Sequence, residues 1–535
     1  MNQVEVKRRQ IESLAHLLGA VALLLLGNYM GENGLAYFAA AYEVFSFMWI
    51  LVGQNVPDAL GRMLRAKNAR NQYRNMYRIR RYALISQGLL GLVMSILLAA
   101  VGGIVVTNVF HMPNGAFLTV ILAAALLLRT VESILLGYFQ GKGSEFPTAV
   151  SAVLRQVFFI GFGLLFGNLF MRYGEMVSAL LGQHKFVGMY GAIGVAVAAA
   201  LTELFLLLFL GIIYRGGSKK NVADPAEGLK SIDSFSSVLR ALYGNMAGEI
   251  LSGMLQRLPI WIGLFLLGAA ASELVNIEIT YGIFYGKYLV LTGGVVCLID
   301  ALILPAAAKV QTYVRRDEPK YARSIFQTGL HVTVVYGLFF SVFLAVMGNY
   351  VAEIFCKSGV TDAGAMFSYG AFAILFTALS GYFYRFLWIA GKRYLLLLGL
   401  GVMSLTFFVS ALLFVNVGKL GVNSYVYAGM IANIVLCALL GILSCRELQS
   451  GIDWVQSLGL PAGCACVVGL VCLFVGKAIS PHLGALVTVI VCLAASWIVY
   501  WIALVLMRNF REQDLKHVPA GGLVRVLGQM LRVYS

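Results

Sequence analysis

The sequence predicts an all-α polytopic membrane protein with about 14 transmembrane helices, built as two pseudo-repeated six-helix lobes plus two C-terminal helices. Hydrophobic residues make up 60% of its 535 residues and charged residues only 12%, against about 25% charged residues in soluble domains. Apolar windows of about 20 residues, the length that crosses a bilayer, recur along the whole chain. Basic segments follow the second and the eighth of these windows.

The windows also give the predicted domain boundaries. The spans cover roughly residues 12–31, 34–56, 82–108, 116–137, 148–171, 188–213, 238–267, 281–304, 325–347, 365–389, 394–416, 424–444, 461–480 and 484–507. We expect an N-terminal lobe over 1–213, a cytoplasmic linker over 214–236, a C-terminal lobe over 237–444, two additional helices over 445–507 and a basic cytoplasmic tail over 508–535. In the tail, a short apolar face is expected to lie on the membrane surface; it comprises Leu523, Val526, Leu527, Met530 and Leu531.

The orientation of every span follows from the segment Pro57–Tyr82, which holds eight cations and one carboxylate, Asp58. Each Arg or Lys at mid-membrane costs about 2.5–3.5 kcal/mol on insertion scales, so this segment marks the cytoplasmic side. The segments then predicted to be cytoplasmic hold 30 Lys and Arg, against five in the outside loops. We therefore expect a multi-pass protein of the bacterial plasma membrane with both termini cytoplasmic. The net charge of +16 reflects this topology rather than a nucleic-acid partner.

Two landmarks indicate a duplicated six-helix unit. Pro57 and Pro305 each end a hydrophobic run and begin a basic segment, 248 residues apart. The pairs Gly141-Lys142 and Gly391-Lys392 end aromatic-rich spans, 250 residues apart. Parallel repeats of this kind place a substrate site near the midplane, at the interface between the halves. The alternative is that Pro and Gly-Lys simply recur at cytoplasmic helix ends.

Two stretches resemble a known family. GYFQGKGSEFPTAVSAVLRQV (137–157) and GKYLVLTGG…LILPAAAKV (286–310) are similar to segments of the polysaccharide transporters of the multidrug/oligosaccharidyl-lipid/polysaccharide (MOP) exporter superfamily. Fourteen spans fit the branch that holds stage V sporulation protein B, the lipid II flippases and the O-antigen flippases. The resemblance implies a flippase that moves a polyprenyl-(di)phosphate-linked saccharide from the inner to the outer leaflet by alternating access. It also implies that spans thirteen and fourteen form a groove for the lipid tail.

Two other classes of function compete with the flippase. One is an ion-coupled multidrug or small-molecule antiporter of the same superfamily, and the more remote one is a membrane-embedded polysaccharide polymerase or ligase. We expect no enzyme, because the outside loops are short and hold no recognisable catalytic spacing. We also expect no catalytic residue, metal or cofactor, and the chain has no G-x-x-x-x-G-K-[ST] motif for ATP. The expected partners are the lipid-linked saccharide and membrane lipids, with glycosyltransferases or cell-wall synthases as candidates, and the expected state is a monomer.

Ionisable and polar residues inside spans are candidates for function, because burying them in lipid is costly. The substrate-binding candidates for a central cavity are Arg257, Arg385, Lys287, Asn245, Ser252, Gln256 and Arg129. The candidates for coupling to Na⁺ or H⁺ are Glu43, Glu249, Glu203 and Asp300. The cations suit a lipid (di)phosphate, because a guanidinium presents a fork of donors to phosphate oxygens.

Each of these assignments has a structural alternative. Asn245, Glu249, Ser252 and Gln256 share one helix face, which must meet either a wet cavity or a polar seam between helices. Glu43 could instead neutralise one fixed cation.

The remaining charges have similar alternatives. Lys287 lies among tyrosines, which suits sugar-phosphate recognition but also snorkelling to headgroups. We expect Arg129 and Glu132 to pair within one helix, and Arg155 and Asp300 to lie close to the cytoplasmic ends of their spans, at the interface. Among the eight cysteines, we expect Cys356 in an outside loop and Cys445 at a cytoplasmic helix end.

Overall fold

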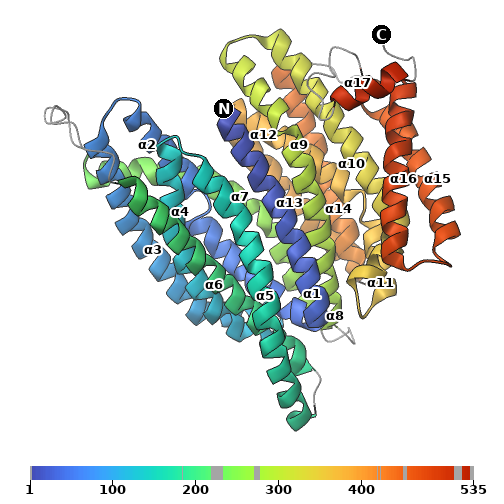
Figure 1. Ribbon diagram of the computed structural model, residues 1–535, viewed down its shortest axis with the longest axis horizontal. Coiled ribbons are helices and arrows are strands. Elements are labelled where there is room, and N and C mark those ends of the chain that lie inside the picture. The colour runs from blue at the N-terminus through green and yellow to red at the C-terminus, as the bar shows by residue number, and fades with distance from the viewer. Residues whose placement is uncertain are drawn as a thin grey trace. The chain divides into compact units, whose positions relative to one another are not determined.

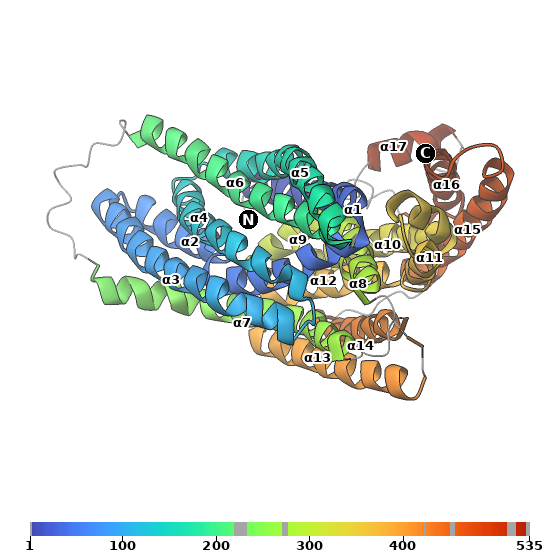
Figure 2. The ribbon, with the colours of Figure 1, turned by 90° about the horizontal axis from the view of Figure 1, so that it is seen from below.

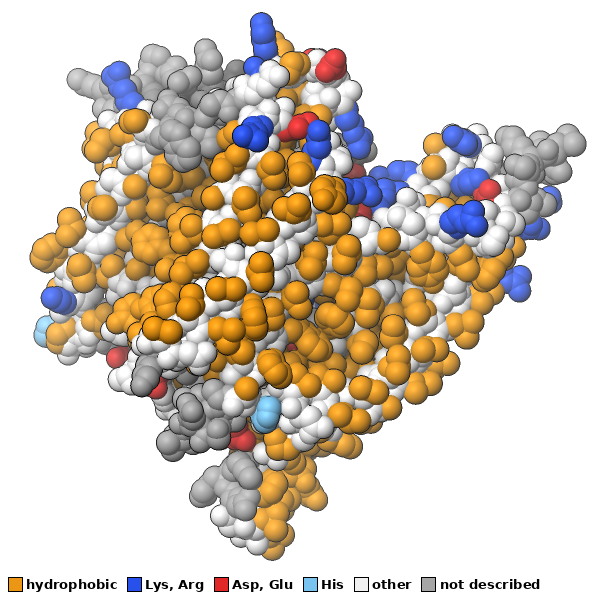
Figure 3. Space-filling view, turned by 180° about the vertical axis from the view of Figure 1, so that it is seen from behind, with side chains coloured by type: hydrophobic (Ala, Val, Ile, Leu, Met, Phe, Trp, Pro, Cys, Tyr) orange, Lys and Arg blue, Asp and Glu red, His pale blue; other side chains and the backbone are white. Residues whose placement is uncertain are grey.

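A computed structural model describes residues 3–182, 185–218, 233–269, 277–418, 420–421, 423–449, 455–510 and 521–530. Every regular element in these ranges is helical, which confirms the predicted fold class (Figure 1). Leucine, isoleucine, valine and phenylalanine side chains are exposed along most of the long helices, so hydrophobic groups cover broad areas of the surface (Figure 3). Such a surface is stable in lipid rather than in water.

Helix α1 (Gln3–Val52) contains the first two predicted spans. Its 50 residues would extend about 75 Å, more than twice the hydrocarbon thickness. The helix is broken at Gly31, where φ is 76° and ψ is 169°. Only glycine adopts this backbone conformation readily, because it has no Cβ to clash. The break therefore separates two spans at the place that the sequence predicts.

The basic segment is mostly helical rather than a loop. It consists of α2 (Val56–Asn68), which begins with Pro57 in its first turn, a short turn, and the start of α3 (Tyr73–Asn108). Proline suits this place because its missing N–H would have no partner in the first turn. All cations of the segment except Arg70, which lies in the turn, are thus held on two helices that pack against each other.

One compact unit comprises residues 22–286. Its further elements are η1 (Pro113–Gly115), α4 (Ala116–Gly141), α5 (Phe146–Leu181), α6 (Lys185–Ser218), α7 (Phe235–Ala269) and α8 (Ile277–Tyr281), with the π-helical turn η4 (Gly282–Tyr288) at its end. Helix α4 packs against α2, α3 and α6, and α5 lies along α6 (Figure 2). Glycines allow α1 and α6 to approach closely: a Cβ on Gly34 would lie 2.5 Å from the carbonyl oxygen of Gly188.

The other compact unit comprises residues 1–21 and 287–535. Its elements are α9 (Leu289–Arg315), α10 (Pro319–Phe355), α11 (Val360–Tyr369), α12 (Ala373–Ile389), α13 (Arg393–Asn416), α14 (Asn423–Leu448), η5 (Val455–Gly459), α15 (Leu460–Ile479), α16 (Ala485–Leu506) and α17 (Gly521–Met530). Helix α10 packs against α9, α11 and α12, and also against α15 and α16. Helix α13 lies beside α14 (Figure 2). The two additional C-terminal helices therefore belong to this unit.

These two units differ from the predicted lobes at both ends. Residues up to Val21 group with the C-terminal helices, and α7 groups with the N-terminal ones. Most of the predicted linker lies outside the described residues. The predicted lobes follow the internal repeat, whereas the units follow packing, and the two divisions need not coincide.

The number of spans agrees with the prediction. Within the described residues, 12 helices are long and apolar enough to cross a membrane, or 13 if the bent pair α11–α12 forms one span. In that count Gln3–Asn68 is a single helix, so the break at Gly31 raises the total to fourteen.

The repeat is visible in how helices end. After α2 and α9 the chain turns at Asn71 (φ 54°) and Asp317 (φ 57°), and after α4 and α12 it turns at Gly143 (φ 79°) and Gly391 (φ 78°). In all four turns the N–H of this residue donates to the carbonyl three residues back, and the next N–H donates to the carbonyl five residues back. This is the Schellman pattern. Asn71 and Asp317 are 246 residues apart, and Gly143 and Gly391 are 248 residues apart. In the repeat, Gly143 rather than Gly141 therefore corresponds to Gly391.

Three local expectations are wrong or only partly tested. Pro305 does not end a helix but lies inside α9. Cys356 is buried, so it is not the accessible outside thiol that we expected. In the tail, α17 buries Val524 and exposes Val526 and Met530, whereas the side chains of Leu523, Leu527 and Leu531 lie outside the described ones.

Candidate functional site

The first site pair joins α1 to α7. The guanidinium of Arg257 donates to a carboxylate oxygen of Glu43 at 2.8 Å. The Arg257 side chain is 36% exposed and that of Glu43 is 14% exposed. Glu43 lies 12 residues beyond the break at Gly31, about 18 Å along the helix, and thus well inside its span. Of the two interpretations of Glu43, the structure supports neutralisation of a fixed cation.

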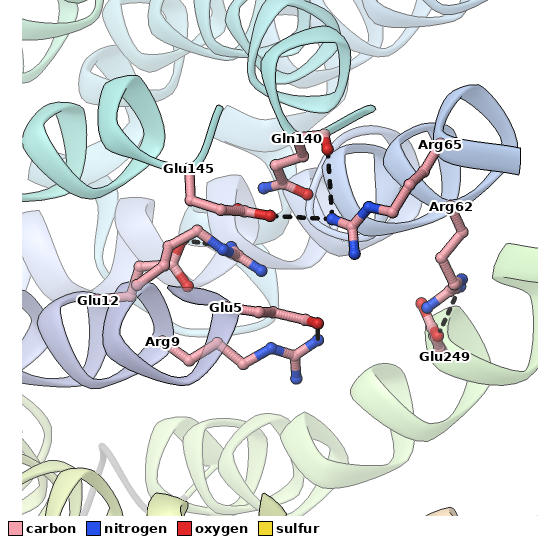
Figure 4. A network of polar contacts seen from close by, with 9 residues as sticks. Glu5, Arg9, Glu12, Arg62, Arg65, Gln140, Glu145 and Glu249 are labelled. Carbon is pink, nitrogen blue, oxygen red and sulfur yellow. Dashed lines mark hydrogen bonds and ion pairs between the residues drawn. The ribbon is translucent and has the colours of Figure 1, made fainter. Parts of the chain in front are cut away.

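The second pair ties α7 to the basic segment. Arg62 of α2 contacts Glu249 at 3.1 Å, and Arg65 of the same helix contacts Glu145 at 2.9 Å (Figure 4). Arg65 also donates to the carbonyl of Gln140 near the end of α4. Both arginines are half-exposed. Glu249, a coupling candidate, therefore pairs with an arginine of the basic segment.

The polar face predicted for α7 divides into two parts. Ser252 is buried, and its hydroxyl donates to the backbone carbonyl of Glu249. Asn245 and Gln256 are exposed. Ser252 thus satisfies its hydroxyl within its own helix, and substrate contact by Asn245 and Gln256 stays a prediction.

A buried ion network joins α4, α5 and α6. Arg155 of α5 contacts Glu132 of α4 at 2.5 Å and Glu203 of α6 at 3.2 Å. Arg129 of α4 lies 3.7 Å from Glu203, and its guanidinium carbon lies 4.5 Å from the ring centre of Trp49. These ion pairs all run between helices, so the expected pairing of Arg129 with Glu132 within α4 is wrong.

This network contains four residues considered in the sequence analysis. Arg155 lies nine residues into α5, about 14 Å from its start, where it pairs with carboxylates of two other helices. Two cations face two carboxylates, so the network is neutral. Its Arg129 and Glu203, our candidates for substrate binding and coupling, already contact each other inside the protein.

In the other unit, Arg385 of α12 donates to Asp300 of α9 at 2.6 Å. The side chains are 29% and 21% exposed. Asp300 lies 15 residues before the end of α9 at Arg315, about 23 Å along the helix, so the helix continues well past the end that the sequence predicts near Pro305. The sequence prediction underestimates the length of α9 because it takes Pro305 as the end of the helix.

Lys287 is fully buried. Its ammonium group donates to the backbone carbonyl of Phe355 at the end of α10, where helix carbonyls lack partners within the helix. This position excludes snorkelling to headgroups.

The arrangement separates two kinds of charged residue. The network around Arg155 has two carboxylates for its central cation, whereas Arg257 and Arg385 are each more exposed and each contact one carboxylate. A guanidinium can bind two partners through its fork of donors. Arg257 and Arg385 could therefore donate to a second anionic oxygen while each keeps its carboxylate partner, because both side chains are already partly exposed. Within the described residues, no group of three or more His, Cys, Asp and Glu could hold a metal ion.

Solved transporters share this fold. An outward-facing multidrug resistance MATE family transporter of the MOP superfamily aligns with a TM-score of 0.60 at 14% identity, covering 84% of this chain and 98% of that chain. The eukaryotic MATE transporter AtDTX14 aligns with a TM-score of 0.58 at 16% identity, covering 83% and 96%. A MOP superfamily transporter from Pyrococcus furiosus aligns with a TM-score of 0.51 at 13% identity, covering 83% of this chain and 95% of that chain. These alignments show that the chain has the fold of the MATE transporters, a polytopic all-helical membrane fold.

The family follows from sequence. Residues 11–311 match the polysaccharide biosynthesis protein family, and the chain belongs to it. Stage V sporulation protein B of Bacillus subtilis is 23% identical over 219 residues, which are 41% of this chain. That match spans 39% of the length of the Bacillus protein.

Proposed function

We propose that the protein translocates a polyprenyl-(di)phosphate-linked saccharide from the inner to the outer leaflet of a bacterial plasma membrane by alternating access. The observation that carries the proposal is the half-exposed Arg257 of α7, held inside the spans by Glu43 of a different helix, in a chain of the polysaccharide biosynthesis protein family. Arg385 with Asp300 is a second, partly exposed pair, in the other unit.

In both pairs, the arginine could exchange its carboxylate partner for a phosphate group of the substrate. An uncompensated charge inside a membrane protein costs several kcal/mol, and a carboxylate partner lowers that cost while no substrate is bound. A (di)phosphate brings more negative charge than a carboxylate and accepts the same two-donor contact from guanidinium. Substrate binding then compensates Arg257, and Glu43 is free to bind a proton or Na⁺.

The driving force is proposed to be electrical. Outward movement of an anion across an inside-negative membrane is favourable by about 2.3 kcal/mol per charge per 100 mV. The arginines stay on their helices and return after release, so the net movement is that of the lipid anion. The proposed partners are the lipid-linked saccharide and membrane lipids, with glycosyltransferases or cell-wall synthases as candidates, and the proposed state is a monomer.

An ion-coupled antiporter is the second candidate. It is supported by the fold shared with multidrug MATE transporters. In the Pyrococcus transporter, a reverse polarity of the binding pocket suggests a different function for that protein, so this one fold accommodates different pockets. For an antiporter, a carboxylate such as Glu43 must bind an ion in every cycle.

The test uses the purified full-length protein in liposomes. A polyprenyl-diphosphate saccharide carrying a fluorophore on its sugar is placed in the inner leaflet, and its arrival outside is followed by a membrane-impermeant quencher. We expect flipping by the wild type, little by Arg257→Gln or Arg385→Gln, and normal rates for Lys392→Gln. Lys392 forms an ion pair with Glu447 at 3.2 Å, and both side chains are exposed. The Lys392→Gln variant therefore controls for the loss of an ion pair as such. Proton-linked efflux of cationic drugs with no flipping would establish the antiporter instead.

A further inference from the structure

Two cations lie against one tyrosine ring at the end of α4 that adjoins the basic segment. The guanidinium carbon of Arg80, near the start of α3, is 5.2 Å from the ring centre of Tyr138, and the ammonium nitrogen of Lys142 is 4.8 Å from it. Arg80 also lies 4.7 Å from the ring centre of Tyr214 and donates to its hydroxyl. The ring centre of Tyr77 lies 5.5 Å from the guanidinium carbon of Arg80. This cluster of Tyr77, Arg80, Tyr138, Lys142 and Tyr214 is called the tyrosine-cation cluster below.

The cluster differs from its neighbours in charge. Arg62, Arg65 and Lys67 of the basic segment pair with Glu249, Glu145 and Asp233. Across the parts of the chain that the structure describes, no carboxylate forms an ion pair with Arg80 or Lys142. Burial lowers the pKa of Lys142, and the positive charge of Arg80 acts in the same direction. Two positive charges are therefore close together, with aromatic rings and a hydroxyl but no carboxylate.

The surroundings indicate what kind of anion fits. Arg80 and Lys142 are half-buried. Part of each side chain is therefore exposed and can be reached by a ligand. Leu84 and Ile85, one turn further along α3, and Phe146, just beyond Lys142, all have exposed apolar side chains. A lipid could place its phosphate beside Arg80 and Lys142 and its hydrocarbon chain along these exposed apolar side chains.

We propose that the tyrosine-cation cluster binds the phosphate group of a membrane lipid, with Arg80 and Lys142 contacting the phosphate oxygens and Tyr214 orienting Arg80. The positive-inside prediction places this site at the cytoplasmic leaflet, where a lipid substrate begins its passage. The proposal rests on the proposed function only for the choice of one probe lipid, because binding is measurable without transport.

Native mass spectrometry of the purified full-length protein tests the site. The probes are undecaprenyl diphosphate, phosphatidic acid, and phosphatidylcholine as a zwitterionic control, each with and without inorganic phosphate. For the wild type we expect retention of the two anionic lipids. Since each variant loses a charged hydrogen-bond donor to the phosphate, Arg80→Gln and Lys142→Gln should each bind these lipids about tenfold more weakly, which is about 1.4 kcal/mol.

The matched control is Arg78→Gln, which removes an exposed cation two residues from Arg80 on the same helix. It should bind both lipids as the wild type does. Equal losses in Arg78→Gln and Lys142→Gln would show general charge attraction and overturn the site, as would displacement of the lipids by inorganic phosphate alone. Preference for undecaprenyl diphosphate over phosphatidic acid would identify the substrate as the ligand, and equal retention would identify anionic lipid in general.

Two further measurements keep the result independent of folding and of transport. Thermal unfolding of each variant shows whether the fold is kept, and Lys142→Gln provides the test if Arg80→Gln unfolds. A variant that loses lipid binding but still flips the saccharide refutes only a role in transport. A wild type that binds lipid but flips no saccharide refutes only the proposed function.

Discussion

Glu43 and Arg257 are 214 residues apart in the chain, yet their side chains meet at 2.8 Å and join α1 to α7. This contact pairs a coupling candidate with a substrate candidate. In the sequence each is an isolated charge within a span. Their proximity means that a substrate anion would compete with Glu43 for the guanidinium, and that its binding would leave Glu43 available to a proton or Na⁺.

The first prediction concerns this pair. Arg257→Gln should abolish flipping, and adding Glu43→Gln should not restore it, because the phosphate then lacks its cation. Glu43→Gln alone should lower the rate without abolishing it. The flipping assay in liposomes measures all three. If the double variant flips normally, the pair is a structural contact, and Arg257 does not bind substrate.

The buried network around Arg155 should behave differently. Arg155→Gln leaves Glu132 and Glu203 without their shared cation, and breaking a buried pair costs about 3–5 kcal/mol. We expect a marked fall in thermal stability and in membrane protein level. The double variant Arg155→Gln/Glu132→Gln should recover part of the loss, since Glu203 then keeps Arg129 as its partner and no buried charge is left uncompensated. A double variant less stable than Arg155→Gln would argue against this account.

Energy coupling distinguishes the flippase from the antiporter. In cells, dissipating the membrane potential should slow the outward appearance of the saccharide more than collapsing the pH gradient does, because the cargo is an anion. Glu249→Gln, like Glu43→Gln, should retain partial activity. Ionophores selective for each gradient provide the measurement. Transport that ignores the potential but stops in either Gln variant would establish obligatory ion coupling.

Topology can be tested with introduced thiols, since Cys356 is buried. In a cysteine-free background, Ser358→Cys, in the exposed turn after α10, should react with a membrane-impermeant maleimide on intact cells. Ala69→Cys, in the exposed turn between α2 and α3, should react only after the cells are opened. The opposite pattern would reverse the orientation of every span.

Much of the fold could be predicted because the bilayer imposes strict local rules. Hydrophobic windows of bilayer length give the spans, and the excess of arginine and lysine in Pro57–Tyr82 gives their expected direction. Gly31 marks the break in α1 for an equally local reason, since other residues rarely adopt its backbone angles. Proline was the weaker signal: Pro57 begins a helix, whereas Pro305 lies within one.

The partners of the charged residues depended on the tertiary structure. Arg129 and Glu132 share one helix face, so local spacing predicts that they pair, yet Glu132 contacts Arg155 on α5 and Arg129 contacts Glu203 on α6. Asp300 and Arg385 likewise meet across 85 residues. The sequence alone predicts which charges lie within hydrophobic spans, because the cost of a charge in lipid depends on each residue by itself. Which charges compensate each other depends on how helices rotate and pack, and only the folded chain determines that.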